Sequence, residues 1–245
     1  MKILSIDTAS NICGVSILEN TNTICTLDKA TGRTHSENLM PMIDNCFKTT
    51  NLSLKDIDLI ACDIGPGSFT GIRIGVATTK AFKDSLDIDV VPVNSLLGIS
   101  YNVLDELLEN DCVASILDCK NDNCYFALFQ KKDNHLETLI EPQAEDIDSA
   151  LSILKSYKED SLESSEKLYF IGDGSTLHKE KIVEQFSDAK IFSDNKNNLN
   201  SYCLALAGLD ILDSGNVSSE ILPLYLKKPQ AQRQLEEKQK NSERI

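Results

Sequence analysis

The segment DIGPGSFTGIRIG, residues 63–75, joins an apolar, strand-like stretch to an amphipathic, helix-like one. Its glycines permit positive φ angles that other residues rarely adopt, as a tight turn requires. Ser68 or Thr70 can accept a hydrogen bond from an early backbone N–H and so cap the helix that runs to about Leu86. The segment therefore predicts a strand-to-helix turn followed by a capped helix.

The same turn could cradle a phosphate, because the N-terminus of a helix attracts anions. A Walker loop would end in Gly-Lys-Ser/Thr, whereas this turn ends in Thr70-Gly71-Ile72, with Arg73 as the only cation nearby. A P-loop is therefore excluded. Two interpretations stay open: a weak phosphate site that includes Gly65, Gly67 and Ser68, or a turn that only aims the helix.

The chain around this turn predicts two similar α/β units. Residues 1–102 contain three short strands, a helix from about Thr34 to Lys48, a strand, the helix that follows the turn, and a last strand. Residues 103–226 return to much the same β-β-β-α-β-α order, with a helix predicted from Thr176. We therefore predict an N-terminal lobe, a C-terminal lobe and, over residues 227–245, a basic polar tail.

An aspartate closes the first predicted strand of each half, Asp7 in one and Asp118 in the other. A duplicated plan with these aspartates resembles the actin/Hsp70/sugar-kinase superfamily, an α/β fold in which ATP lies between two lobes and the first hairpins hold phosphate and metal. That resemblance implies a weak nucleotide or phosphate site at these aspartates, at the glycine-rich turn, and at Gly172 and Gly174. For the last two glycines, the Gly-Asp-Gly pattern favours an ordinary turn over an adenosine-side motif.

Both hairpins depart from the superfamily pattern. Its phosphate hairpins usually carry a glycine two residues after the aspartate, whereas Ala9 and Lys120 stand there in this chain. Without glycine the backbone cannot approach a phosphate as closely. Asp7 could hold magnesium in a working ATPase or accept hydrogen bonds from its own turn, and the degraded pattern favours the second role.

The composition excludes several classes of protein. The net charge of −14 opposes tight binding of a nucleic acid by the chain alone, although the tail carries six Lys and Arg against three Glu. No apolar run approaches the ~20 residues that span a bilayer, and the N-terminus lacks a signal-peptide pattern. We therefore expect a cytoplasmic protein that binds no membrane. The eight cysteines include no Cys-x-x-Cys pair, which favours buried, reduced thiols.

Five motifs make the chain similar to one bacterial family. They are ILSIDTAS, HSENLMPMID, GPGSFTGIRIG, VPVNSL and LPLYLKK, at residues 3–10, 35–44, 65–75, 91–96 and 222–228. They resemble the TsaB (YeaZ) family of threonylcarbamoyladenosine biosynthesis proteins, over nearly the whole chain. This resemblance implies a part in placing threonylcarbamoyl on N6 of adenosine 37 in tRNAs that read ANN codons.

The same resemblance implies a subunit without catalysis of its own. The relative TsaD, which carries out the transfer, has a His-x-x-x-His metal pair where Ser95 and Ile99 stand in this chain. A catalytic metal needs several convergent donors. We therefore expect no metal site and no intrinsic cofactor, with ATP or ADP and magnesium only at the level of a complex. His35, at the start of its helix, is expected to be a surface or capping residue rather than a catalytic base.

The resemblance also implies a role for the two predicted helices of the N-terminal lobe, about Thr34–Lys48 and Thr70–Leu86. TsaB pairs with TsaD through the first two helices of each N-terminal lobe, with TsaE as a further nucleotide-dependent partner. The resemblance also implies that the chain forms a homodimer when TsaD is absent, and that it contacts tRNA only through the complex. The residues that would form the interface are His35, Leu39, Met42, Ile43, Cys46, Gly71, Ile72, Gly75, Thr78, Thr79 and Phe82.

Two alternatives stay open. The two helices could pack only within their own lobe, with the glycines at 71 and 75 leaving a stripe against which another helix lies. The chain could also be an autonomous ATP-dependent kinase or ATPase of the same fold, with a nucleotide site built from Asp7, Asp118 and the glycine turns.

Overall fold

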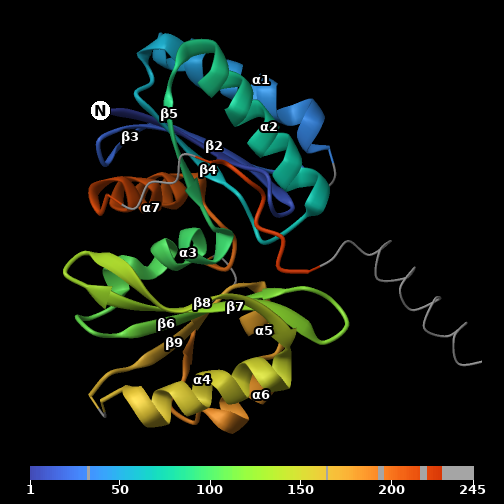
Figure 1. Ribbon diagram of the computed structural model, residues 1–245, viewed down its shortest axis with the longest axis vertical. Coiled ribbons are helices and arrows are strands. Elements are labelled where there is room, and N and C mark those ends of the chain that lie inside the picture. Colours follow the sequence, from blue (N-terminus) through green and yellow to red (C-terminus); the bar gives the residue numbers. More distant parts are fainter. Residues whose placement is uncertain (32–33, 164, 193–195, 216–219, 228–245) are drawn as a thin grey trace, which may run out of the picture.

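The computed structural model describes residues 1–31, 34–163, 165–192, 196–215 and 220–227, and Figure 1 shows its two lobes. The N-terminal lobe holds a five-stranded sheet in the order β3-β2-β1-β4-β5. Strands β1 to β3 pair antiparallel, whereas β4 and β5 run parallel to β1. The strands are β1 (Lys2–Asp7), β2 (Ile12–Glu19), β3 (Asn22–Ala30), β4 (Leu59–Asp63) and β5 (Asp89–Val93).

The C-terminal lobe repeats this sheet. Its order is β8-β7-β6-β9-β10, so the first strand of the half again lies in the centre, between an antiparallel hairpin and parallel strands. The predicted duplication is confirmed, and with it the two-lobe actin/Hsp70/sugar-kinase-like α/β fold. The strands are β6 (Cys112–Asp118), β7 (Asn123–Lys132), β8 (His135–Asp146), β9 (Leu168–Ile171) and β10 (Lys190–Ile191).

Helices cover the outer face of each sheet. On the N-terminal sheet these are α1 (His35–Thr50) and α2 (Phe69–Leu86). The short 3₁₀ helix η1 (Leu54–Asp56) joins α1 to β4, and the glycine-rich turn joins β4 to α2. The C-terminal sheet is covered by α4 (Ile147–Ser161), α5 (Asp173–Leu177) and α6 (Lys179–Gln185). The single helix predicted from Thr176 is wrong: His178, with a non-helical ψ of 22°, separates α5 from α6.

Two helices lie between the sheets, and each packs on the sheet that the other half of the chain forms. The helix α3 (Ser95–Ser100) packs on β6 and β7, whereas α7 (Ser201–Asp213) packs on β1, β2, β4 and β5 (Figure 1). The predicted boundary between residues 102 and 103 falls inside the 3₁₀ helix η2 (Tyr101–Glu106). The lobes share one apolar core between their sheets, which includes Val93, Leu96, Ile99, Val113, Phe129 and Leu204.

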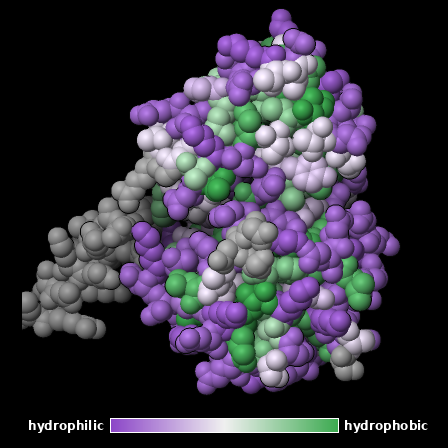
Figure 2. All heavy atoms as spheres, turned by 180° about the vertical axis from the view of Figure 1, so that it is seen from behind, coloured by the Kyte–Doolittle hydropathy of each residue, from purple (hydrophilic) through white to green (hydrophobic). Residues whose placement is uncertain are grey.

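The surface agrees with the acidic, polar composition. Figure 2 shows the face opposite to that of Figure 1, where hydrophilic residues cover much of both lobes and hydrophobic ones form separate patches. Within the ranges that the structure describes, no helix is both long and apolar enough to cross a membrane. All eight cysteines lie in those ranges as free thiols, and all except Cys25 and Cys119 are buried. Of the predicted basic tail, residues 228–245 lie outside the described part.

Candidate functional site

The glycine-rich turn packs against the connection between β1 and β2. The backbone N–H of Ser68 donates to the carbonyl of Ala9 at 2.7 Å, and the Thr8 hydroxyl donates to the carbonyl of Gly71 at 2.7 Å. A Cβ atom added at Gly67 would lie 2.3 Å from the Ala9 oxygen, and one at Gly71 only 1.9 Å from the Thr8 oxygen. The glycines therefore accommodate the chain's own backbone, which occupies the space beside the turn.

The start of α2 is capped as predicted. The Ser68 hydroxyl accepts a hydrogen bond from the backbone N–H of Gly71 at 3.2 Å. One turn later, a Cβ at Gly75 would lie 2.6 Å from the hydroxyl oxygen of Thr8. The two helical glycines were expected to admit another helix. They mainly admit Thr8, just after β1, and Gly71 also lies next to His35 of α1, 3.3 Å from the added Cβ.

Two buried aspartates lie together where β1 and β4 end. The parallel register of these strands makes Asp7 and Asp63 neighbours, and their exposed fractions are 0% and 1%. The Asp63 carboxylate accepts hydrogen bonds from the backbone N–H of Gly65 and from the Ser95 hydroxyl, both at 2.7 Å. Asp7 Oδ1 accepts from the backbone N–H of Ala9 at 2.8 Å. Its Oδ2 is buried without a further hydrogen-bond partner among the described residues.

Both carboxyl groups have raised pKa values. Burial raises the pKa of Asp7 well above its ordinary value, and the nearby Asp63 raises it further. Burial also raises the pKa of Asp63, to about 6, although its hydrogen bonds oppose the shift. Two ionised carboxylates in contact repel each other, so the pair holds a proton to a higher pH than an isolated aspartate does. Asp7 was a candidate site residue from the sequence, whereas Asp63 was not, and Ser95 was considered only as the residue that replaces a metal-binding histidine.

The edge where Asp7 lies does not fit a magnesium nucleotide. The Asp7 carboxyl is fully buried, and α7 begins beside it. The Ser5 hydroxyl donates to the carbonyl of Ser201, the first residue of α7, at 2.6 Å, and the hydroxyls of Ser16 and Ser201 lie 2.6 Å apart. In the described ranges, no three His, Cys, Asp or Glu side chains are grouped so that they could hold a metal ion.

The equivalent edge of the C-terminal sheet is built in the same way. Asp118 Oδ1 accepts from the backbone N–H of Lys120 at 2.8 Å, as Asp7 does from the residue two positions later. Gly172 has φ of 104°, and a Cβ there would lie 2.2 Å from the carbonyl oxygen of Ile116. A Cβ at Gly174 would lie 2.9 Å from the same oxygen. These glycines let the start of α5 pack on β6.

Most residues of the predicted partner interface point into their own lobe. α1 and α2 turn their apolar stripes toward the sheet, where they form one cluster with β1, β2 and β4. Thr78 and Phe82 are half-buried. Since the stripes are already packed, only the opposite sides of the two helices are free of the core. The buried members are His35, Leu39, Met42, Ile43, Cys46, Gly71, Ile72, Gly75 and Thr79.

The expectation that His35 lies at the surface is wrong. Its side chain is 4% exposed, with Nε2 at 2.9 Å from the carbonyl oxygen of Ser10 and Nδ1 at 3.0 Å from the Thr31 hydroxyl. A carbonyl oxygen only accepts, so Nε2 carries a hydrogen and donates it to Ser10, while Nδ1 pairs with the Thr31 hydroxyl. The ring thus ties the β1–β2 connection to the entry of α1.

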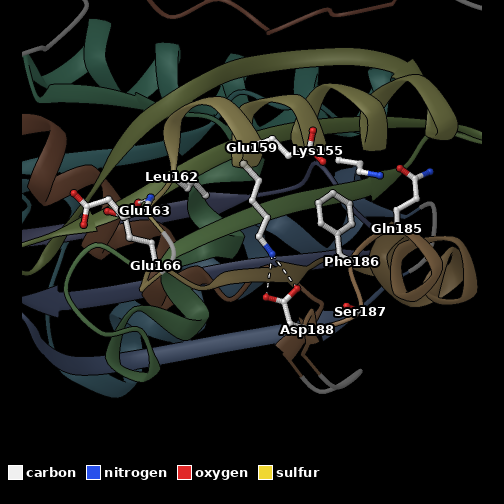
Figure 3. A pocket seen from close by; sticks show the side chains of 10 residues that line it. Lys155, Glu159, Leu162, Glu163, Glu166, Gln185, Phe186, Ser187 and Asp188 are labelled. Atoms are coloured by element: carbon white, nitrogen blue, oxygen red, sulfur yellow. Dashed lines mark hydrogen bonds and ion pairs between the residues drawn. The ribbon is translucent and has the colours of Figure 1, made fainter.

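A cavity of 390 Å³ lies between α4 and α6, at the end of the molecule opposite to α1 and α2 (Figures 1 and 3). In its lining, Lys158 forms an ion pair with Asp188 at 2.9 Å. Acidic side chains outnumber basic ones in its lining, so the cavity repels a phosphate. The lining residues are Lys155, Lys158, Glu159, Leu162, Glu163, Glu166, Gln185, Phe186, Ser187 and Asp188.

Comparisons with known proteins agree on one group. The family model of TsaD, tRNA N6-adenosine threonylcarbamoyltransferase, matches residues 26–233. The tRNA threonylcarbamoyladenosine biosynthesis protein TsaB of Bacillus subtilis (strain 168) is 30% identical over 186 residues, which cover 75% of this chain and 76% of that protein. TsaB of Haemophilus influenzae is 24% identical over 244 residues, covering 93% and 94%.

A solved structure extends the agreement to the fold. YeaZ from Pseudomonas aeruginosa superposes with a TM-score of 0.74 at 20% identity, covering 92% of this chain and 99% of that one. Both lobes are therefore common to the two proteins. The chain belongs to the TsaB (YeaZ) family of tRNA threonylcarbamoyladenosine biosynthesis proteins, within the wider group that the TsaD model describes.

Proposed function

We propose that the chain is a non-catalytic subunit that binds and activates TsaD for threonylcarbamoyl transfer to N6 of adenosine 37 in tRNAs that read ANN codons. The observation that carries this proposal is the outer surface of α1 and α2. There, Met40 is 48% exposed, and Pro41, Ala77 and Ala81 are exposed beside it or on the neighbouring helix. We call the following set the docking face: Met40, Pro41, Ile74, Ala77, Thr78 and Ala81.

The docking face has the properties of a helix-packing surface. Alanine and threonine side chains are small, so another helix can approach the backbone of α2 closely, and Met40 is a flexible apolar group that adapts to a partner. The helices beneath the face are held by a packed core and by a capped, glycine-rich turn. A surface that is already ordered loses less conformational freedom when it binds.

The absence of intrinsic chemistry is supported by what stands at the positions of catalysis. Ser95 and Ile99 occupy the places where the resemblance puts the metal-binding histidines of TsaD. Ser95 is hydrogen-bonded to Asp63, and Ile99 is 1% exposed in the core between the sheets. Neither side chain offers a nitrogen donor to a metal ion.

The docking face can be tested with charged substitutions. We expect Ala77→Glu and Met40→Glu each to weaken binding to TsaD by at least about tenfold, because a desolvated, unpaired charge in an interface costs more than 1.4 kcal/mol. The measurement is a calorimetric titration of the full chain with TsaD, followed by tRNA modification in a reconstituted reaction. Ile153→Glu, at an exposed apolar position of α4, is the matched control and should bind normally.

The choice of positions follows from burial. Met42 is 8% exposed and Gly75 faces Thr8, so charges at either position would disturb the core and report on folding instead. Thermal unfolding of each variant should therefore accompany the titration. Unchanged affinity of both docking-face variants for TsaD would contradict the proposal.

Further partners belong to the same proposal. TsaE would join the pair as a nucleotide-dependent component, ATP or ADP with magnesium would act at the level of the complex, and tRNA would be contacted only through it. In the absence of TsaD, the docking face would pair with a second copy of the chain. Sedimentation of wild type and Ala77→Glu distinguishes this dimer from contacts made elsewhere.

The alternative of an autonomous ATPase predicts a different titration. We expect the isolated chain to give no binding heat with Mg-ATP, because Asp7 is buried and α7 begins at the edge where a nucleotide would lie. Asp7→Ala serves as the control. Micromolar binding by wild type that Asp7→Ala abolishes would restore the alternative.

A further inference from the structure

The last described segment of the chain, residues 220–227, returns from the C-terminal half to the start of α2 (Figure 1). Ile221 is 3% exposed within the apolar cluster beneath α1 and α2. The backbone N–H of Leu224 donates to the carbonyl of Ile64 at 2.8 Å, and the Leu224 oxygen would lie 3.3 Å from a Cβ at Gly65. The segment therefore packs on the turn that sets the direction of α2.

Tyr225 connects this segment to the first turn of α2. Its ring stacks on Phe69, the first residue of the helix, with centroids 4.9 Å apart and planes inclined by 24°. Its hydroxyl accepts a hydrogen bond from Arg73 Nε at 2.7 Å, and the guanidinium carbon lies 5.5 Å from the ring centroid. Since residues four apart lie on one side of a helix, Tyr225 spans the whole first turn.

The contact of Tyr225 with the first turn of α2 lies at the surface, outside the apolar core. Tyr225 is 42% exposed, and Arg73 is exposed as well, so the contact buries little apolar area. The first turn of a helix lacks some internal hydrogen bonds and is the part that frays most readily. A side chain that holds both Phe69 and Arg73 therefore acts mainly on the direction and order of that turn.

We propose that Tyr225 and Arg73 are positioning residues of the docking face. The clip, residues 221–225, fixes the first turn of α2, and so presents Ala77 and Ala81 in one orientation before a partner binds. This inference rests on the proposed function. It gives the C-terminal segment a role in recognition although the segment is not part of the docking face. The segment orders α2 before binding, and this reduces the conformational freedom that is lost when TsaD binds.

Two substitutions in the full chain test the clip. Tyr225→Phe keeps the stack on Phe69 and removes only the hydroxyl acceptor, whereas Tyr225→Ala removes both contacts. Leu222→Ala is the matched control, since Leu222 lies in the same segment and is 51% exposed. Each variant is measured twice: by hydrogen exchange of the backbone amides of residues 71–75 in the free chain, and by calorimetric titration with TsaD.

We expect Tyr225→Ala to speed exchange of these amides and to weaken TsaD binding by roughly threefold to tenfold, the range of an aromatic stack with a cation–π contact. Tyr225→Phe should give smaller changes of the same kind, and Leu222→Ala neither. Weaker binding with unchanged exchange would make Tyr225 a direct contact and overturn the positioning role. Unchanged exchange and unchanged binding would overturn it too.

Different results would contradict the proposed function. If Ala77→Glu and Met40→Glu leave TsaD binding intact, the docking face is wrong, and no clip can position it. If those variants lose binding while both Tyr225 variants exchange and bind like wild type, the docking face stands and only the clip is wrong.

Discussion

Replacing Gly71 with alanine is expected to lower the free energy of unfolding by about 2 kcal/mol. In an exposed helix interior, alanine is about 1 kcal/mol more favourable than glycine, so the expected sign is the reverse of the ordinary one. The reason is the Thr8 carbonyl oxygen, 1.9 Å from the added Cβ. Backbone must move, which costs about 1–3 kcal/mol as overpacking, and the buried hydrogen bond between Thr8 and the Gly71 carbonyl is strained, at about 1 kcal/mol more.

Urea denaturation of the full chain measures this effect. Thr70→Ala, at an exposed position in the same turn, is the control and should stay within about 0.5 kcal/mol of wild type. Because Gly71 sets how closely α2 approaches β1, the alanine variant should also bind TsaD more weakly than Thr70→Ala does. A Gly71→Ala variant as stable as wild type would mean that the β1–β2 connection yields without cost, contrary to the fit described above.

The second large effect concerns pH. The pKa of Asp7 is raised well above its ordinary value, and that of Asp63 is raised to about 6. Between pH 4 and the raised pKa values, the folded chain therefore binds more protons than the unfolded chain, and the free energy of unfolding falls as pH rises. Each pKa unit corresponds to about 1.4 kcal/mol, so the two carboxyl groups together contribute stability on the order of a few kcal/mol that is lost across this window.

Asp7→Asn is expected to remove the share of this pH dependence that belongs to Asp7. The amide of asparagine is uncharged at every pH tested and can donate to Asp63, while its oxygen still accepts from the Ala9 N–H. The measurement is the free energy of unfolding of wild type and variant from pH 5 to 8. Wild type should lose more stability than the variant over that interval.

Asp188→Asn provides a control of opposite sign. Its hydrogen bond with Lys158 lowers the pKa of the exposed Asp188, so that pair stabilises the fold above the ordinary pKa of an aspartate and is lost as pH falls. Since exposed pairs are screened, the change should be small. Parallel stability curves for wild type and Asp7→Asn would show that the titration of Asp7 does not contribute to the pH dependence of stability.

The order of elements could be predicted from the sequence because each strand and helix has its own period. Apolar runs ending in Asp7 and Asp118 marked the first strand of each half, and Ser68 marked the start of α2. The placement of α3 and α7 could not be predicted. Both helices are apolar on nearly all sides, so no periodicity says which of two sheets they cover.

The candidate site was only partly predictable. The apolar stripes of α1 and α2 were visible, but a stripe faces the nearest sheet first, and the sides left over, with Met40, Ala77 and Ala81, carried no pattern of their own. Asp63 stands 56 residues from Asp7, and only the pairing of β1 with β4 makes them neighbours. A usable signal existed: Asp63 ends an apolar strand just as Asp7 does, and parallel strands end at one edge.

The exchange of α3 and α7 between the lobes has a mechanical consequence. In an enzyme whose two lobes move about a hinge, the lobes separate to admit and release a nucleotide. Here each sheet is lined by a helix from the other half, so such a movement would pull Leu96 and Leu204 out of their common core. The shared core therefore holds the two lobes together. We expect the described part of the chain to melt in one cooperative transition, and either half expressed alone to expose an apolar face and aggregate.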